Sequence, residues 1–157
     1  MKLKNTELDY FFKIDWILKN ELAVGKAPRN DFHIESLKKE NIVSVFSLCS
    51  EDEAPPPKDI ERNFTTRRLV LPDHKYTEAL SYEKLDQALN ILSELLSIGS
   101  VFVHCVASVE RSPLICMGWL VRYHKLTPCQ ALDYLMDIHP GTNPLSSQFN
   151  LLKKLKP

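Results

Sequence analysis

Two short runs of nearly continuous apolar residues, 42–48 (IVSVFSL) and 101–104 (VFVH), most constrain the fold of this chain. Runs of this kind are typical of strands buried on both faces of a parallel sheet. Residues 82–98, which lie between the two runs, repeat leucine and alanine at helical spacing until Gly99 ends the stripe. Strands that are interleaved with helices in this way indicate an α/β domain.

The remaining segments extend the same pattern toward both ends of the chain. Further elements are expected as one or two short strands within 15–24, a helix after Asn30 as N-cap, a surface loop over 50–58, a strand over 64–71, helices over 111–124 and 127–138, and a last helix from residue 143 or 146. We therefore predict a single domain over residues 1–157, with a central, mostly parallel sheet of four or five strands flanked by helices.

Charge and hydropathy exclude several classes of protein. Twenty Lys and Arg against twenty Asp and Glu give a formal net charge of zero, so no overall field draws the chain to nucleic acid or to an anionic membrane. No run reaches the roughly 18 apolar residues that a membrane-spanning helix needs, and the first ten residues lack the apolar core of a signal peptide. We expect a cytoplasmic, monomeric protein without nucleic-acid or membrane partners, in which any anion site is local.

The four cysteines, at positions 49, 105, 116 and 129, show neither CxxC spacing nor the Cys/His spacing of zinc sites. This argues against a disulfide framework and against a structural metal. Cys116 and Cys129 fall on predicted helices among apolar neighbours, where a cysteine is usually a small buried hydrophobic side chain. Cys105 differs, because it lies between a predicted strand and a predicted helix. No metal and no cofactor are expected.

Residues 101–114 (VFVHCVASVERSPL) place Cys105 at the end of a buried strand and Arg111 at the start of a helix. Ligands of α/β sheets bind beyond the carboxyl ends of the strands. Arg111 supplies a planar fork of donors that can grip two oxygens at once. If the loop curls, its backbone N–H groups converge on one point together with those of the first helical turn, which suits a tetrahedral dianion such as phosphate. The N–H groups in question belong to Val106, Ala107, Ser108, Val109, Glu110 and Arg111.

The same groups act on the side chain of Cys105. Backbone N–H dipoles and a guanidinium favour the thiolate, which is the nucleophilic form of cysteine. Ser112 can donate its hydroxyl to that sulfur and ease the departure of sulfur from phosphorus. His104 is expected to shape the loop through hydrogen bonds rather than to carry protons. These residue types predict nucleophilic attack on phosphorus by Cys105.

The segment HCVASVERSP resembles the HC-x5-R-S/T signature of the protein tyrosine phosphatases, and its RSP ending resembles that of their small dual-specificity branch. The resemblance extends from about residue 42 to the end of the chain. It implies a protein tyrosine phosphatase-like fold and a phosphomonoesterase that forms a phosphocysteine intermediate. Members of this branch carry a general-acid aspartate roughly thirty residues before the cysteine, and Asp73 lies thirty-two residues before Cys105. The resemblance thus implies that Asp73 is the acid in the first step and the base in the second.

Two loop positions depart from the family pattern. Ser108 stands where the family commonly has glycine, which would strain the backbone if this position needs a positive φ. Glu110 brings a carboxylate into an anion-binding loop, and we expect it to point away, toward a cation or the general-acid loop. These departures keep an alternative open, namely a weakly active or silent module that binds phosphorylated partners. Sulfur transfer and arsenate reduction also use a loop cysteine and an arginine, but their families space or place the motif differently.

Relatives with this signature act on phosphotyrosine, on phosphoserine and phosphothreonine, on phosphoinositides or on RNA 5′-phosphates. The five residues between Cys105 and Arg111 include no lysine or histidine, so the loop supplies no extra cation for a polyphosphorylated head group. The chain also shows no long insertion for tyrosine recognition, which indicates a shallow pocket. We therefore rank phosphorylated proteins first as substrates.

Overall fold

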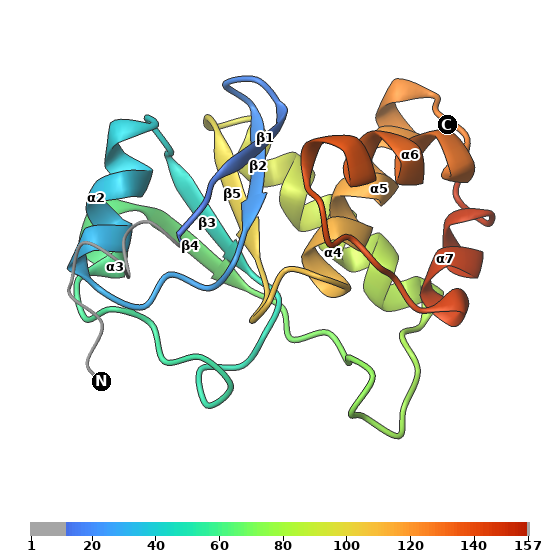
Figure 1. Cartoon of the computed structure of the whole chain (residues 1–157), viewed down its shortest axis with the longest axis horizontal. Helices are drawn as coiled ribbons and strands as arrows, with labels where there is room; N and C mark the ends of the chain where they lie inside the picture. The colour runs from blue at the N-terminus through green and yellow to red at the C-terminus, as the bar shows by residue number, and fades with distance from the viewer. Residues whose placement is uncertain (1–11, 157) are drawn as a thin grey trace.

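The strands of the central sheet lie in the order β1-β2-β5-β3-β4 (Figure 1). Strand β1 runs antiparallel to β2, and every other neighbouring pair is parallel. The strands are β1 (Asp15–Leu18), β2 (Leu22–Gly25), β3 (Ser44–Ser47), β4 (Thr65–Arg68) and β5 (Val101–His104). This computed structural model describes residues 12–156. The predicted α/β fold with a mostly parallel sheet is confirmed.

Helices cover both faces of the sheet. Figure 1 shows α2 and α3 beside one face, while the longer helices are gathered on the other. The helices are α2 (Asp31–Lys39), α3 (Ile60–Asn63), α4 (Tyr82–Leu96), α5 (Arg111–His124), α6 (Pro128–Ile138) and α7 (Ser146–Leu152). None of the helices in the described part of the chain is long and apolar enough to cross a membrane.

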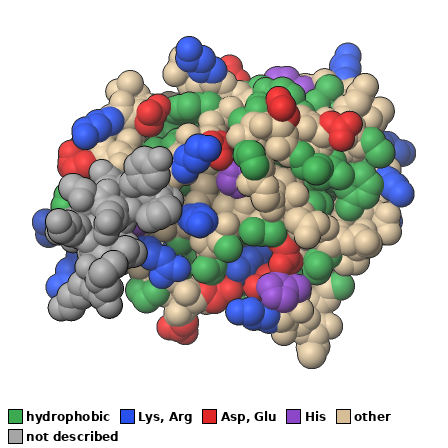
Figure 2. All heavy atoms as spheres, viewed as in Figure 1, with side chains coloured by type: hydrophobic (Ala, Val, Ile, Leu, Met, Phe, Trp, Pro, Cys, Tyr) green, Lys and Arg blue, Asp and Glu red, His purple; other side chains and the backbone are tan. Residues whose placement is uncertain are grey.

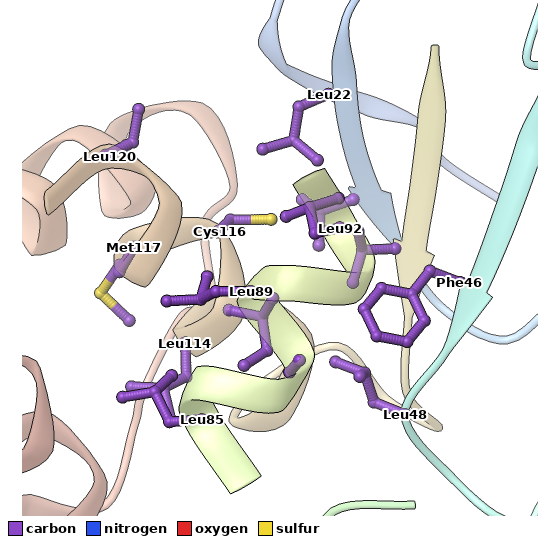
Figure 3. Packing of buried hydrophobic residues seen from close by; sticks show 14 of the residues in the cluster. Leu22, Phe46, Leu48, Leu85, Leu89, Leu92, Leu114, Cys116, Met117 and Leu120 are labelled. Carbon is purple, nitrogen blue, oxygen red and sulfur yellow. The ribbon is translucent and has the colours of Figure 1, made fainter. Parts of the chain in front are cut away.

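An apolar cluster on each face joins the helices to the sheet. In the larger cluster, Phe46 of β3 lies near Leu89 and Leu92 of α4, and all three side chains are fully buried (Figure 3). Gly118 of α5 faces α4 there, and a Cβ at this position would lie 3.3 Å from the Leu89 side chain, so the missing side chain lets the two helices approach closely. On the other face, α2 packs Ile34 and Leu37 against the sheet.

The sheet brings several loops together at the carboxyl ends of its parallel strands. His104 at the end of β5 is in register with Gly25 at the end of β2 and with Ser47 at the end of β3. Because these strands are parallel, the loops that follow them start side by side. The loop that follows β4 starts at the same end of the sheet, because β4 is parallel to β3. The loop with Cys105 therefore lies among the loops that follow β2, β3 and β4.

Three local expectations were wrong. Strand β4 (Thr65–Arg68) is shorter than the predicted 64–71, since it is paired only with β3, whose last residue, Ser47, is in register with Arg68. Helix α3 (Ile60–Asn63) was not predicted, because four residues are too few to show a periodic pattern. Cys129 is exposed rather than buried, since it occupies the first turn of α6 on the solvent side. Cys116 is buried as expected.

Candidate active site

Cys105 and Arg111 stand at the two ends of the loop between β5 and α5. Cys105 follows β5 directly, Arg111 is the first residue of α5, and both side chains are buried. The N-cap residue, Glu110, makes no capping hydrogen bond with its side chain in the described structure, so the N–H groups of the first turn can serve another acceptor. The loop borders a cavity of about 350 Å³. Its lining residues are Glu53, Asp73, His74, Lys75, Cys105, Val106, Ala107, Val109, Glu110 and Arg111.

The Arg111 guanidinium is held from two sides. Its two terminal nitrogens lie 3.0 and 3.3 Å from the carboxylate oxygens of Glu53, and Nη1 also donates to the Leu71 carbonyl at 3.1 Å. Burial by itself would lower the pKa of Arg111, but the hydrogen bonds to Glu53 and the nearby acidic groups raise it above its ordinary value. Burial conversely raises the pKa of Glu53, and the hydrogen bond from Arg111 reverses this to a net lowering. Arg111 is therefore a fixed cation at the cavity wall.

Asp73 faces the same cavity from the loop after β4. Its Oδ2 atom lies 3.7 Å from Nη2 of Arg111, and only about a tenth of its side chain is exposed (11%). Its Oδ1 atom accepts a hydrogen bond from the backbone N–H of Lys75 at 2.8 Å, which orients the carboxyl group. The structure thus brings Asp73, Cys105 and Arg111 to one cavity, although thirty-two residues separate Asp73 from Cys105.

The Cys105 thiol meets a serine hydroxyl at its buried side. Sγ lies 3.3 Å from Oγ of Ser112, which in turn lies 2.9 Å from Oγ of Ser108. Ser108 has φ of 58°, so the loop does need the left-handed region at the position where serine replaces glycine. Its side chain does not line the cavity but points behind the loop, toward Ser112 and His139. The strain at Ser108 is thus accompanied by hydrogen bonds that a glycine could not make.

Glu110 is engaged by neighbouring loops. One carboxylate oxygen lies 2.5 Å from Nδ1 of His74, the residue after Asp73, and the other accepts a hydrogen bond from Gln148 at 3.3 Å. Glu110 remains part of the cavity lining. Its carboxylate is nevertheless directed to the loop that carries the predicted general acid, as expected, which lessens its repulsion of a bound anion.

Residues 24–156 match the family model described as the dual specificity phosphatase catalytic domain. The chain belongs to this dual specificity phosphatase family.

Curated relatives of this dual specificity phosphatase domain include enzymes named for two substrate types. It is 29% identical over 108 residues to the phosphatidylglycerophosphate phosphatase PTPMT1 of Arabidopsis thaliana, and 26% identical over 140 residues to PTPMT2 of the same plant. It is 26% identical over 121 residues to dual specificity protein phosphatase 1 of Arabidopsis thaliana. The alignments cover 68%, 84% and 76% of this chain but 32%, 60% and 58% of the relatives, so the chain spans about a third to three fifths of their lengths.

Solved structures share the fold of this phosphatase domain. The crystal structure of PTPMT1 in complex with PI(5)P aligns with a TM-score of 0.77 over 92% of this chain and 93% of that chain, at 20% sequence identity. The active form of Tk-PTP aligns with a TM-score of 0.77 over 90% of this chain and 95% of that chain, at 23% identity.

His104, the last residue of β5, is buried and hydrogen-bonded through both ring nitrogens. Its Nδ1 atom lies 2.9 Å from the carbonyl of Cys105, which can only accept, so Nδ1 carries the proton and Nε2 accepts from the Ser47 hydroxyl at 2.7 Å. Burial lowers the pKa of His104 from 6.5 to about 4, and the charges of Arg68 and Arg111 act in the same direction. A neutral imidazole therefore joins Ser47 at the end of β3 to the start of the loop over residues 105–110, the candidate catalytic loop.

Sequence reasoning missed three residues that support the site. Glu53 fixes Arg111, but it lies in the acidic, proline-rich stretch that predicted only a surface loop. Asp15 and His139 meet at 2.6 Å behind the catalytic loop, although 124 residues separate them. No local pattern connects such positions, and only the spatial packing of α6 on β1 reveals them. Among residues 12–156, no cluster of His, Cys, Asp or Glu is arranged to hold a metal ion.

The neutral state of His104 predicts a pH-dependent stability. The unfolded chain binds a proton near pH 6.5 and the folded chain only near pH 4, so the contribution of His104 is fully present above pH 6.5 and is lost as the pH falls toward 4. The wild type should lose about 3 kcal/mol more than His104→Asn over this range. Urea unfolding at pH 7.5, 6 and 4.5 measures the difference. Parallel pH dependence of the two proteins would show that His104 is not buried in its neutral form.

Proposed function

We propose that this chain is a phosphomonoesterase that works through a phosphocysteine at Cys105. The observation that carries the proposal is the meeting of a thiol, a fixed guanidinium and an oriented carboxyl group at one cavity, formed by Cys105, Arg111 and Asp73. Arg111 and the N–H groups of the loop would bind the phosphoryl oxygens, with donors arranged before the substrate arrives. Membership in the dual specificity phosphatase family supports this chemistry.

The reaction divides into two displacements. In the first, the Cys105 thiolate attacks phosphorus, an S–P bond forms, the P–O bond to the leaving group breaks, and Asp73 gives its proton to the departing oxygen. In the second, Asp73 takes a proton from water, the water oxygen attacks phosphorus, and the S–P bond breaks to release inorganic phosphate. Ser112 is within 3.3 Å of the sulfur and would donate to it as negative charge returns. Cys105 is itself the nucleophile, so the mechanism calls for no metal.

The alternative, a silent phosphate-binding module, rests on the two loop positions that depart from the family pattern. Ser108 occupies its left-handed conformation with its hydroxyl engaged by Ser112 and His139. Glu110 is engaged by His74 and Gln148. Both departures from the family pattern are thus accommodated by contacts in this chain, and neither removes a group that the two displacements require.

Two substrate classes follow from the relatives. Phosphorylated proteins, which the sequence favours, are supported by the relatives named as dual specificity protein phosphatases. A glycerophospholipid phosphomonoester is supported by the two relatives named phosphatidylglycerophosphate phosphatases. A cavity of about 350 Å³ bordered by exposed Ala107 and Val109 is open enough for either. Turnover of a phosphotyrosine peptide and of short-chain phosphatidylglycerophosphate, compared under the same conditions, ranks the two classes.

Hydrolysis of p-nitrophenyl phosphate tests the proposed chemistry. Cys105→Ser should reduce the rate to background, because the hydroxyl is a far weaker nucleophile at neutral pH. Asp73→Asn should lower kcat by about 10²–10⁴-fold for an alkyl phosphate, whose leaving group needs a proton, and by less for the aryl ester. Cys129→Ser replaces an exposed thiol and is the matched control that keeps full activity. Activity that survives Cys105→Ser would rule the mechanism out.

A further inference from the structure

A second pocket adjoins the catalytic cavity. It has a volume of about 330 Å³ and shares two wall residues, Val106 and Ala107, with that cavity. Its lining residues are Phe12, Lys26, Ala27, Arg29, His33, Val106 and Ala107. Three of the seven, Lys26, Ala27 and Arg29, come from the segment between β2 and α2, which follows the strand next to β5. A ligand that reaches the catalytic loop can therefore extend into this pocket.

The segment between β2 and α2 is fixed to the catalytic loop. The backbone N–H of Ala27 donates to the carbonyl of Val106 at 3.2 Å. Two residues further on, the N–H of Arg29 donates to Nδ1 of His33 at 2.9 Å. The His33 ring in turn stacks on Phe12, with their centroids 4.1 Å apart. These contacts hold the backbone that carries Lys26 and Arg29 at a set position relative to Cys105, so the pocket exists before a ligand binds.

The two pockets differ in charge. The catalytic cavity carries the carboxyl groups of Glu53, Asp73 and Glu110 beside its cations. The adjoining pocket has the exposed cations Lys26 and Arg29 in its wall, and none of its lining residues within 12–156 is acidic. Neither cation makes an ion pair with a carboxylate of residues 12–156, whereas the buried Arg111 is paired with Glu53. Several Lys and Arg side chains lie near the centre of the molecule in the view of Figure 2.

We propose that Lys26 and Arg29 form a subsite for a second anionic group of the substrate. The inference rests on the proposed phosphatase activity at Cys105 and names its substrate class: a small phosphomonoester that carries a second phosphate or a phosphodiester a few bonds away. A lysine and an arginine are the side chains that bind phosphate oxygens most strongly. The catalytic loop lacks an additional cation for such a substrate, and the segment after β2 supplies it. A glycerophospholipid head group and a soluble bisphosphate share this chemistry.

Steady-state kinetics on three substrates test the subsite. The substrates are p-nitrophenyl phosphate, phosphatidylglycerophosphate in phosphatidylcholine vesicles, and its deacylated head group, glycerophosphoglycerophosphate. The double variant Lys26→Gln/Arg29→Gln is compared with Lys19→Gln/Lys125→Gln, which removes the same charge from exposed positions outside both pockets. The first variant should lower kcat/KM for the head group and the lipid by roughly tenfold or more and leave p-nitrophenyl phosphate unchanged. The control variant Lys19→Gln/Lys125→Gln should leave kcat/KM unchanged for all three substrates.

Each other outcome overturns the subsite in a distinct way. A loss confined to the vesicle substrate would mean that Lys26 and Arg29 attract an anionic surface. In a parallel assay with a phosphotyrosine peptide that has acidic neighbours, a loss for the peptide but not for the head group would assign the pocket to a protein substrate. If Lys26→Gln/Arg29→Gln has the kcat/KM of the wild type for all three substrates, the pocket binds no part of the substrate. Failure of the wild type to hydrolyse p-nitrophenyl phosphate would instead refute the proposed function itself.

A second, independent observation concerns a buried chain of hydrogen bonds behind the catalytic loop. Nδ1 of His139 lies 2.6 Å from a carboxylate oxygen of Asp15, and Nε2 lies 2.7 Å from the carbonyl and 3.0 Å from the hydroxyl of Ser108. From Ser108 the chain continues to Ser112 at 2.9 Å and to the sulfur of Cys105 at 3.3 Å. Five side chains, from β1, the C-cap of α6, the catalytic loop and the first turn of α5, thus form one continuous path.

The contact between His139 and Ser108 determines which way the hydroxyl protons of Ser108 and Ser112 point. The Ser108 carbonyl only accepts hydrogen bonds, so Nε2 of His139 carries a proton that is directed at Ser108. With Nε2–H directed at Ser108, the Ser108 hydroxyl proton is free to point to Ser112. The Ser112 hydroxyl proton then points to the sulfur of Cys105. Every donor in the path is directed toward the atom that holds negative charge as a thiolate.

The geometry points to Asp15 and His139 as positioning residues for the Ser112 hydroxyl. Their effect falls on the second displacement, in which the S–P bond breaks and the Cys105 thiolate is regenerated. His139 also anchors Ser108, whose left-handed backbone directs the curl of the loop. The pair therefore acts through Ser108 and Ser112 and does not touch the substrate, since neither residue lines the catalytic cavity.

Pre-steady-state kinetics separate this role from simple support of the fold. His139→Ala, and Ser108→Gly, which fits the positive φ without strain but lacks the hydroxyl, should each lower kcat about tenfold while a burst of p-nitrophenol of one equivalent per site appears. His124→Ala removes an exposed histidine and should change neither quantity. A lower melting temperature without a burst in His139→Ala, together with unchanged kinetics of Ser108→Gly, would reduce the pair to a structural role.

Discussion

The central position of β5 fixes the geometry on which the rest of the site depends. All four of its residues are buried, and it is paired in parallel with β2 on one side and β3 on the other. The chain must therefore leave the sheet at Cys105 among the loops that follow the neighbouring strands. Those loops supply Lys26 and Arg29 after β2, Glu53 after β3 and Asp73 after β4. One buried strand thus brings together groups that are far apart in the sequence.

The Arg111 guanidinium already has carboxylate partners before any phosphate arrives. Arg111 is buried, and its guanidinium is compensated by Glu53 at 3.0 Å and by Asp73 at 3.7 Å, as a buried cation requires. An incoming phosphate must compete with the Glu53 carboxylate for the same guanidinium, so Glu53 both orients Arg111 and lowers its net attraction for anions. The formal net charge of zero for the whole chain leaves this local arrangement as the proposed source of phosphate binding.

The sequence predicts the part of the site that lies within one continuous segment, residues 101–114. A buried strand, a cysteine, five residues and an arginine at a helix start predict a loop with converging N–H groups, and the resemblance added Asp73. Glu53 could not be predicted, because its stretch has no periodic pattern. The contact of Asp15 with His139 depends on how α6 packs on β1, which no spacing in the sequence expresses. The exposure of Cys129 was mispredicted, since apolar neighbours do not reveal which side of a first helical turn faces solvent.

The most direct test of this account is the identification of the covalent intermediate. Acid quenching of the reaction with p-nitrophenyl phosphate, followed by digestion and mass spectrometry, should place one phosphoryl group on the peptide that contains Cys105. The same peptide from Cys105→Ser should remain unmodified, and so should the peptides that contain Cys49, Cys116 and Cys129. Steady turnover with the phosphoryl group on another residue, or with no covalent intermediate under conditions that show a burst, would contradict the mechanism.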